Sequence, residues 1–252
     1  MRESMVADRL IGRQLGEFVL REHIGEGSFG LVFRAEQLVL QRQAVLKVAK
    51  IQATDRHAER AVASFLREAR LASRIDHPFA AHVYAFGAEP DALLWIAMEM
   101  VRGTPLDKYL ALQGAMPLEK AMPLLRRICE VVHTVHEQGI VHRDLKPANV
   151  MVVSRAGTLF PKLLDLGVAR DLTQTADVET PRSMMGTPLY MAPEQWESAG
   201  AVTPAADVYA LGIMTYELLT GAPPFGGSSL RELAAHHAFR APARRGPACG
   251  AW

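Results

Sequence analysis

The sequence predicts an α+β protein made of two parts, a small β-rich N-terminal part with one main helix and a larger, mainly helical C-terminal part. β-Branched and aromatic runs broken by a glycine-rich turn occupy residues 18–48, which is typical of strands. Helical periodicity follows at residues 56–74 and 122–138. With 252 residues, the chain can bury a substantial core as one large domain or as two lobes.

The composition excludes several classes of protein. A hydrophobic fraction of 49% excludes a disordered chain, and only 2 Cys exclude a disulfide-stapled one. Cys129 and Cys249 have no clustered partner ligands, so they fit a reducing, cytoplasmic compartment. The formal net charge of +1 gives no global field for nucleic acid, and no apolar run approaches the ~20 residues of a membrane span. We therefore expect no nucleic-acid partner and no membrane segment in this chain.

Residues 1–17 carry several charges without a continuous apolar stretch, so we interpret them as an N-terminal extension and not as a signal peptide. The first strand signals then surround Gly25, Gly27 and Gly30, which spell G-x-G-x-x-G. A dinucleotide-binding turn would need a helix to begin at the third glycine, whereas Gly30 leads into a Leu-Val-Phe run. That run favours a β-hairpin, and a glycine-rich hairpin without a ligand is the remaining alternative.

Period-2 alternation places Lys47 on the strand face that also carries Val45, opposite Leu46. An edge-strand lysine with no special role is the alternative. In the helix at 56–74, Glu68 borders the apolar face, and a carboxylate there needs a cation. Lys47 is the candidate for the cation that pairs with the Glu68 carboxylate. The apolar stripe of this helix is expected at Val62, Phe65, Leu66 and Ala69.

The helix at 122–138 ends at Gly139, and its Cys129 and His136 are interpreted as packing residues. Residues 140–149 then read IVHRDLKPAN, and an apolar strand, a turn at Ala156-Gly157 and the segment 163–167 (LLDLG) follow.

These segments resemble the protein kinase family, and the resemblance extends from residue 18 to residue 225. Six motifs occur in the family's order: the Gly-rich loop at 25–32, the strand lysine Lys47, its helix partner Glu68, the catalytic loop at 142–149, the D-F-G motif at 165–167 and the A-P-E motif at 192–194. Residues 207–212 resemble the buried helix that anchors the catalytic loop. Lys146 and the segment 186–191 are similar to Ser/Thr kinases, and 191–195 to bacterial eukaryotic-like kinases.

The resemblance implies that Asp144 orients the substrate hydroxyl and accepts its proton, and that Lys146 neutralises the moving phosphoryl group. Lys47, held by Glu68, would pair with the phosphates, while Asn149 and Asp165 would bind Mg²⁺ or Mn²⁺ as the cofactor beside ATP. The implied ATP site consists of Ile24, Gly25, Glu26, Gly27, Ser28, Phe29, Gly30, Leu31, Val32, Val45, Lys47, Met98, Glu99, Val101 and Met151.

The implied partners are proteins with Ser or Thr acceptors, together with a kinase dimer for autophosphorylation. We expect control by phosphorylation between Asp165 and Glu194, where Arg143 and Arg170 could pair with the phosphate. The phosphorylation candidates are, in order, Thr180, Ser183, Thr173 and Thr175, whereas Thr187 is assigned to substrate-site structure. A solvated Thr-rich loop is the alternative.

The predicted kinase domain covers residues 18–238, with an N-lobe at 18–98, a hinge at 99–103 and a C-lobe at 104–238, followed by an irregular basic tail at 239–252. Val45 and Leu166 are mild apolar departures from the family pattern. The family continues beyond Phe225 through about three helices and an arginine that pairs with the glutamate at Glu194, but only 228–237 predicts such a helix. We therefore expect a truncated, poorly soluble or weakly active chain. An ATP-binding pseudokinase or scaffold and an inactive kinase fragment are the alternatives to an active Ser/Thr kinase.

Overall fold

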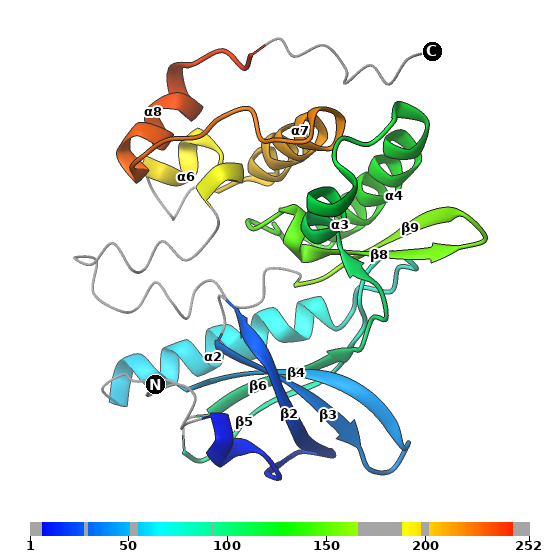
Figure 1. The fold of residues 1–252 in the computed structure, drawn as a ribbon. Helices are drawn as coiled ribbons and strands as arrows, with labels where there is room; N and C mark the ends of the chain where they lie inside the picture. Colours follow the sequence, from blue (N-terminus) through cyan, green and yellow to red (C-terminus); the bar gives the residue numbers. More distant parts are fainter. Residues whose placement is uncertain are drawn as a thin grey trace. The chain divides into compact units, whose positions relative to one another are not determined.

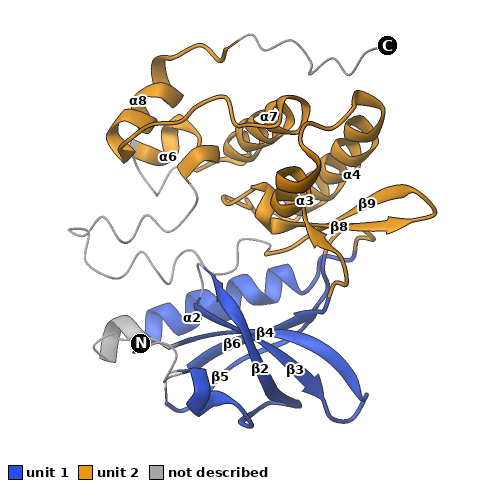
Figure 2. Cartoon of the chain, viewed as in Figure 1, with its two compact units in different colours: residues 1–76, 81–100, 168–185 blue, residues 77–80, 101–167, 186–252 orange. Residues whose placement is uncertain are grey.

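A computed structural model describes residues 7–27, 30–50, 55–91, 93–165, 188–197 and 202–243 (Figure 1). The chain divides into two compact units (Figure 2). Unit 1 comprises residues 1–76, 81–100 and 168–185, and unit 2 comprises residues 77–80, 101–167 and 186–252. Unit 1 holds a six-stranded sheet with one long helix, and unit 2 holds most of the described helices, so the predicted α+β class is confirmed.

The sheet of unit 1 is antiparallel with the strand order β1-β2-β3-β4-β6-β5 (Figure 1). Its strands are β1 Gln14–Leu15, β2 Phe18–Gly27, β3 Gly30–Gln37, β4 Arg42–Lys50, β5 Val83–Ala88 and β6 Leu93–Glu99. Alternate residues of the central strands, among them Phe33, Leu46 and Trp95, are buried in one core. Gly27 pairs with Gly30, so the predicted glycine-rich hairpin is confirmed.

Three residues of the segment 7–15 belong to this core. Ala7, Leu10 and Leu15 are all buried in it, and β1 pairs with the start of β2. Residues 1–17 were predicted to be an extension outside the domain. One helical turn and a two-residue strand are too short to show a period, so their burial could not be predicted from the sequence.

Helix α2 (Asp55–Ala72) belongs to unit 1 and lies against the sheet (Figure 1). Phe65 and Ala69 are fully buried, as expected, but Val62 and Leu66 are only half-buried. The buried stripe is completed instead by Ala61 and Ala72. Small side chains on this stripe allow the helix backbone to approach the sheet closely, and such residues give a weak hydrophobic signal in a sequence.

The elements of unit 2 are a three-stranded sheet and a set of helices. They are β7 Thr104–Pro105, α3 Leu106–Gln113, α4 Leu118–Glu137, η1 Pro147–Asn149, β8 Val150–Arg155, β9 Thr158–Leu163, η3 Pro188–Tyr190, α6 Pro193–Glu197, α7 Pro204–Thr220 and α8 Leu230–Phe239. Ala156 and Gly157, both with positive φ, form the expected turn between β8 and β9. Helix α4 begins four residues earlier than predicted, at Leu118, and therefore contains Pro123 within it.

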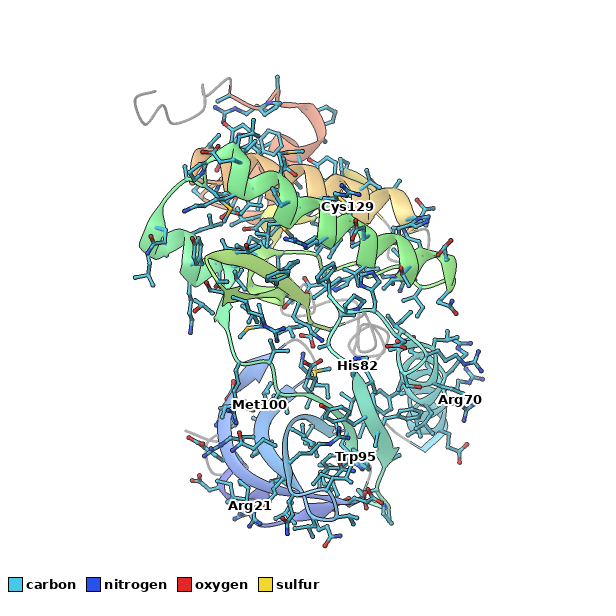
Figure 3. The ribbon with its side chains drawn as sticks, turned by 90° about the vertical axis from the view of Figure 1, so that its right-hand side faces the viewer. Arg21, Arg70, His82, Trp95, Met100 and Cys129 are labelled. Atoms are coloured by element: carbon cyan, nitrogen blue, oxygen red, sulfur yellow. The ribbon has the colours of Figure 1, made fainter. Side chains whose placement is uncertain are left out.

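The interpretation of Cys129 as a packing residue was wrong, because its side chain is exposed on α4 (Figure 3).

Helix α8 includes Phe239, one residue beyond the predicted domain end. Ser229 caps its first turn by accepting a hydrogen bond from the Glu232 amide. Among the described helices, none combines the length and the apolar character that crossing a membrane requires.

Candidate active site

The backbone of the catalytic-loop segment is held by one buried carboxylate. Asp207, on α7, is 1% exposed and accepts hydrogen bonds from the backbone amides of His142 and Arg143, both at 2.8 Å. The Nε2 atom of His136, on α4, lies 2.7 Å from the same carboxylate. Arg143 has a φ of 64°, an uncommon value for a residue with a side chain, so this turn needs such fixed partners.

Asp144 is positioned by the side chains of two other predicted site residues. Its Oδ2 atom accepts hydrogen bonds from Lys146 Nζ at 2.8 Å and from Asn149 Nδ2 at 3.0 Å. Asn149 Nδ2 also donates to the Asp144 backbone carbonyl at 2.8 Å. Asp144 and Lys146 keep 19% and 15% of their side-chain surface exposed, so this carboxylate is held firmly but stays accessible to a substrate.

Asn149 has the chemistry that a metal ligand needs. Its side chain is buried, and the two hydrogen bonds to Asp144 come from its nitrogen, which leaves the carbonyl oxygen as a hard donor for a divalent cation. The residues present therefore fit a Mg²⁺ or Mn²⁺ ion at this position.

Asp165 directly follows a segment tied to the catalytic loop. The Leu164 amide donates to the Asn149 carbonyl at 2.8 Å, and the Leu164 carbonyl lies 3.1 Å from His142 Nε2. Asp165 is half-buried and has a φ of 56°. Within unit 2, the fold thus brings the segments that carry Asp144, Asn149 and Asp165 together. The role of Asp165 as a metal ligand stays a prediction.

In unit 1, the register of the sheet places several predicted ATP-site residues on one face. Val32 pairs with Lys47, Lys47 pairs with Ile96, and Val45 pairs with Met98, so these side chains point to the same side. Buried Leu46 points to the opposite side, as predicted. The pairing of Lys47 with Glu68 stays a prediction; Glu68 Oε1 accepts a hydrogen bond from Ser64 Oγ at 3.3 Å.

Gly30 is the glycine whose lack of a side chain the structure explains most directly. A Cβ atom there would clash with the Val48 backbone carbonyl on β4, and its φ of 141° is one that other residues rarely adopt. At Gly27, by contrast, the nearest atom to an added Cβ is Val32 Cγ2 at 3.9 Å, an ordinary contact.

The segment after the predicted activation loop is tied to α7 and to the catalytic loop. Tyr190 donates a hydrogen bond to Glu217 Oε2 at 2.5 Å, and Gln195 Nε2 donates to the Arg143 carbonyl at 3.2 Å. Burial raises the pKa of Glu217, and burial together with the Glu217 carboxylate raises the pKa of Tyr190. Glu194, expected as a buried carboxylate, is half-buried.

Several predicted residues lie outside the described part of the chain. These are Ser28, Phe29, Leu166, Arg170, Thr173, Thr175, Thr180, Ser183 and Thr187. Activation-loop phosphorylation therefore stays a prediction.

Two contacts near the site were not predicted from the sequence. His136 was interpreted as packing, but it contacts Asp207, and its position in the last turn of α4 was the available signal. Glu217 was not singled out, because a glutamate in an apolar helix has no pattern that names its partner Tyr190.

The comparisons with known proteins agree with this geometry. The protein kinase domain model matches residues 18–244, so the chain belongs to the protein kinase family. The chain is 36% identical over 240 residues to the serine/threonine-protein kinase pkn3 of Myxococcus xanthus, covering 93% of this chain and 43% of that protein. It is 38% identical over 230 residues to pkn2 of the same organism, with 90% of this chain and 27% of that protein covered.

A third relative is the serine/threonine-protein kinase PrkC of Bacillus subtilis, which is 35% identical over 230 residues, covering 90% of this chain and 34% of that protein. The chain spans less than half the length of these three relatives. Membership of the family implies ATP and a divalent metal ion as cofactors.

Proposed function

We propose that this chain transfers the γ-phosphate of ATP, with Mg²⁺ or Mn²⁺, to Ser or Thr hydroxyls of protein substrates. The observation that carries the proposal is the accessible Asp144 carboxylate, held by Lys146 and Asn149 on a loop that Asp207 anchors. The Ser/Thr assignment rests on the names of the relatives, which are serine/threonine-protein kinases.

The residues of the chain perform the steps that phosphoryl transfer requires. Asp144 orients the acceptor hydroxyl and takes its proton as the new phosphorus–oxygen bond forms, while the bond from the γ-phosphorus to the bridging oxygen of ATP breaks and ADP leaves. Lys146, 2.8 Å from Asp144, places a positive charge beside the moving phosphoryl group. Asn149 and Asp165 would hold the metal ion, which when bound neutralises charge on the phosphate oxygens.

An ATP-binding pseudokinase is the less favoured alternative. A chain of that class usually lacks the strand lysine or one of the catalytic or metal-binding aspartates. Here Lys47, Asp144 and Asp165 are all present, and the bonds that position Asp144 are formed.

The test measures transfer of radiolabelled phosphate from ATP to a generic basic protein, with Asp144→Asn as the key variant. We expect the variant to lose transfer but to keep stabilisation by MgATP, which is about 2.7 kcal/mol at a hundredfold excess over Kd. Asp76→Asn, at a carboxylate that is 94% exposed, is the matched control and should transfer normally. Equal transfer by Asp144→Asn and the wild type would refute the assignment, and MgATP stabilisation without wild-type transfer would favour a scaffold.

A further inference from the structure

The outer face of α2 carries a row of arginines. Arg60, Arg67 and Arg70 are exposed on the helix, and Arg74 is exposed in the turn that follows it. At 3.6 residues per turn these positions lie opposite the buried stripe through Phe65. Figure 3 shows Arg70 on the side of α2 that points away from the sheet. At 1.5 Å per residue, the row extends about 20 Å along the helix. We call it the arginine row.

The arginine row has no carboxylate partners among the described residues. Arg67 contacts the Ser64 hydroxyl at 3.5 Å, and no described acidic group lies within ion-pair distance of any of the four guanidinium groups. Four other arginines among the described residues do have such partners. Arg13 pairs with Asp91 at 2.9 Å, Arg21 with Glu36 at 2.7 Å, Arg34 with Glu22 at 2.5 Å and Arg126 with Glu130 at 3.2 Å.

A face selected for solubility alone would mix positive and negative side chains, because opposite charges three or four residues apart stabilise a helix. Helix α4 follows that rule, with Arg126–Glu130 and His133–Glu137 pairs. At the C-terminal end of the row, Arg67 and Arg70 lie three residues apart on α2, and Arg74 follows four residues later in the turn, so like charges adjoin, which destabilises a helix. At its N-terminal end, the exposed Glu59 precedes Arg60. The repulsion within the row would be relieved by an anionic partner.

We propose that the arginine row is a docking site for an acidic protein segment with carboxylates spaced along one side. Charge complementarity argues for this occupant, because guanidinium groups bind carboxylates in paired, directional hydrogen bonds. A membrane surface is a poorer fit. Helices that bind membranes insert an apolar face, but the apolar face of α2 is buried within its own unit, and its exposed face has no large apolar side chain.

The test uses the full 252-residue chain and a fluorescein-labelled helical peptide with six glutamates spaced three and four residues apart on an alanine background. The same peptide with glutamines is the matched probe. Binding is measured by fluorescence anisotropy at low and high salt. The key variant is the triple substitution Arg60→Gln, Arg67→Gln and Arg70→Gln, since glutamine has nearly the same helix propensity as arginine.

A control variant removes the same charge elsewhere, by substituting Lys120, Arg155 and Arg231, all exposed in unit 2, with glutamine. We expect the key variant to bind the glutamate peptide at least tenfold more weakly than the wild type and the control to stay within twofold. Circular dichroism checks that both variants are folded. Equal binding by the wild type and the key variant would overturn the proposal. It would also be overturned if duplex DNA or phosphatidylserine vesicles bound through these arginines while the glutamate peptide did not. Because binding is measured, loss of kinase activity would not affect the result.

Discussion

Asp207 is expected to hold the backbone of the catalytic loop in place, and its substitution tests this role directly. The substitution Asp207→Ala removes the acceptor for two backbone amides, those of His142 and Arg143, and His142 is fully buried. A buried donor left without a partner costs about 1–3 kcal/mol. Two donors that lose their acceptor predict a loss of about 2–6 kcal/mol in the free energy of unfolding, a large part of the ~5–15 kcal/mol typical of a domain.

The assay is urea denaturation followed by tryptophan fluorescence, together with the rate of phosphate transfer. Asp207→Asn keeps one carbonyl oxygen and should lose roughly half as much stability, because one of the two amides keeps its acceptor. Asp107→Ala, at an exposed carboxylate, is the control and should change little. If Asp207→Ala unfolds within about 0.5 kcal/mol of the wild type, the amides have found other partners and the reasoning fails.

Two further predictions concern His237 and Gly30. His237 is 6% exposed, lies 2.8 Å from Tyr209 Oη, and burial lowers its pKa to about 4. The stability that neutral His237 contributes is complete above its unfolded pKa of about 6.5 and is lost as the pH falls toward 4. Between pH 7 and pH 5, the free energy of unfolding should therefore fall by about 1–2 kcal/mol more for the wild type than for His237→Phe. If the melting temperatures of the wild type and His237→Phe fall by the same amount between pH 7 and pH 5, the prediction is wrong. Gly30→Ala should destabilise the fold by about 1–3 kcal/mol, because its Cβ meets the Val48 carbonyl, whereas Gly27→Ala should be nearly neutral. Melting temperatures that fall equally for both would show that the contact with β4 is unimportant.

Strong local periods in the sequence predicted the main elements well. The hairpin at the glycine-rich turn, the orientation of Lys47 and the β8–β9 turn all follow from patterns within a few residues. The errors came from weak local signals. Ala7 and Leu10 are buried although they precede the predicted domain, and the α2 stripe depends on alanines, which are less distinctive than Val62 or Leu66.

The site residues were named through their motif order, not through their contacts. The roles of Asp144, Lys146 and Asn149 were implied by the resemblance, and their contacts form within one loop because residues 142–149 are close in sequence. The hydrogen bond from the His142 amide to Asp207 joins residues more than sixty positions apart, and His136, which also contacts Asp207, lies on a different helix. Neither contact has a sequence period of its own.

The family and the chemical groups of the site follow from the chain alone, because phosphoryl transfer needs particular residue types in a recognisable order. Which buried groups hold these residues in place depends on how the helices pack. Asp207 accepts hydrogen bonds from two backbone amides and lies beside the His136 ring because α4 and α7 pack together. Tyr190 forms a hydrogen bond with Glu217 because η3 packs on α7. Such pairings depend on the distance between elements after packing. A linear pattern contains the identity of each side chain but not the partner that the fold brings to it.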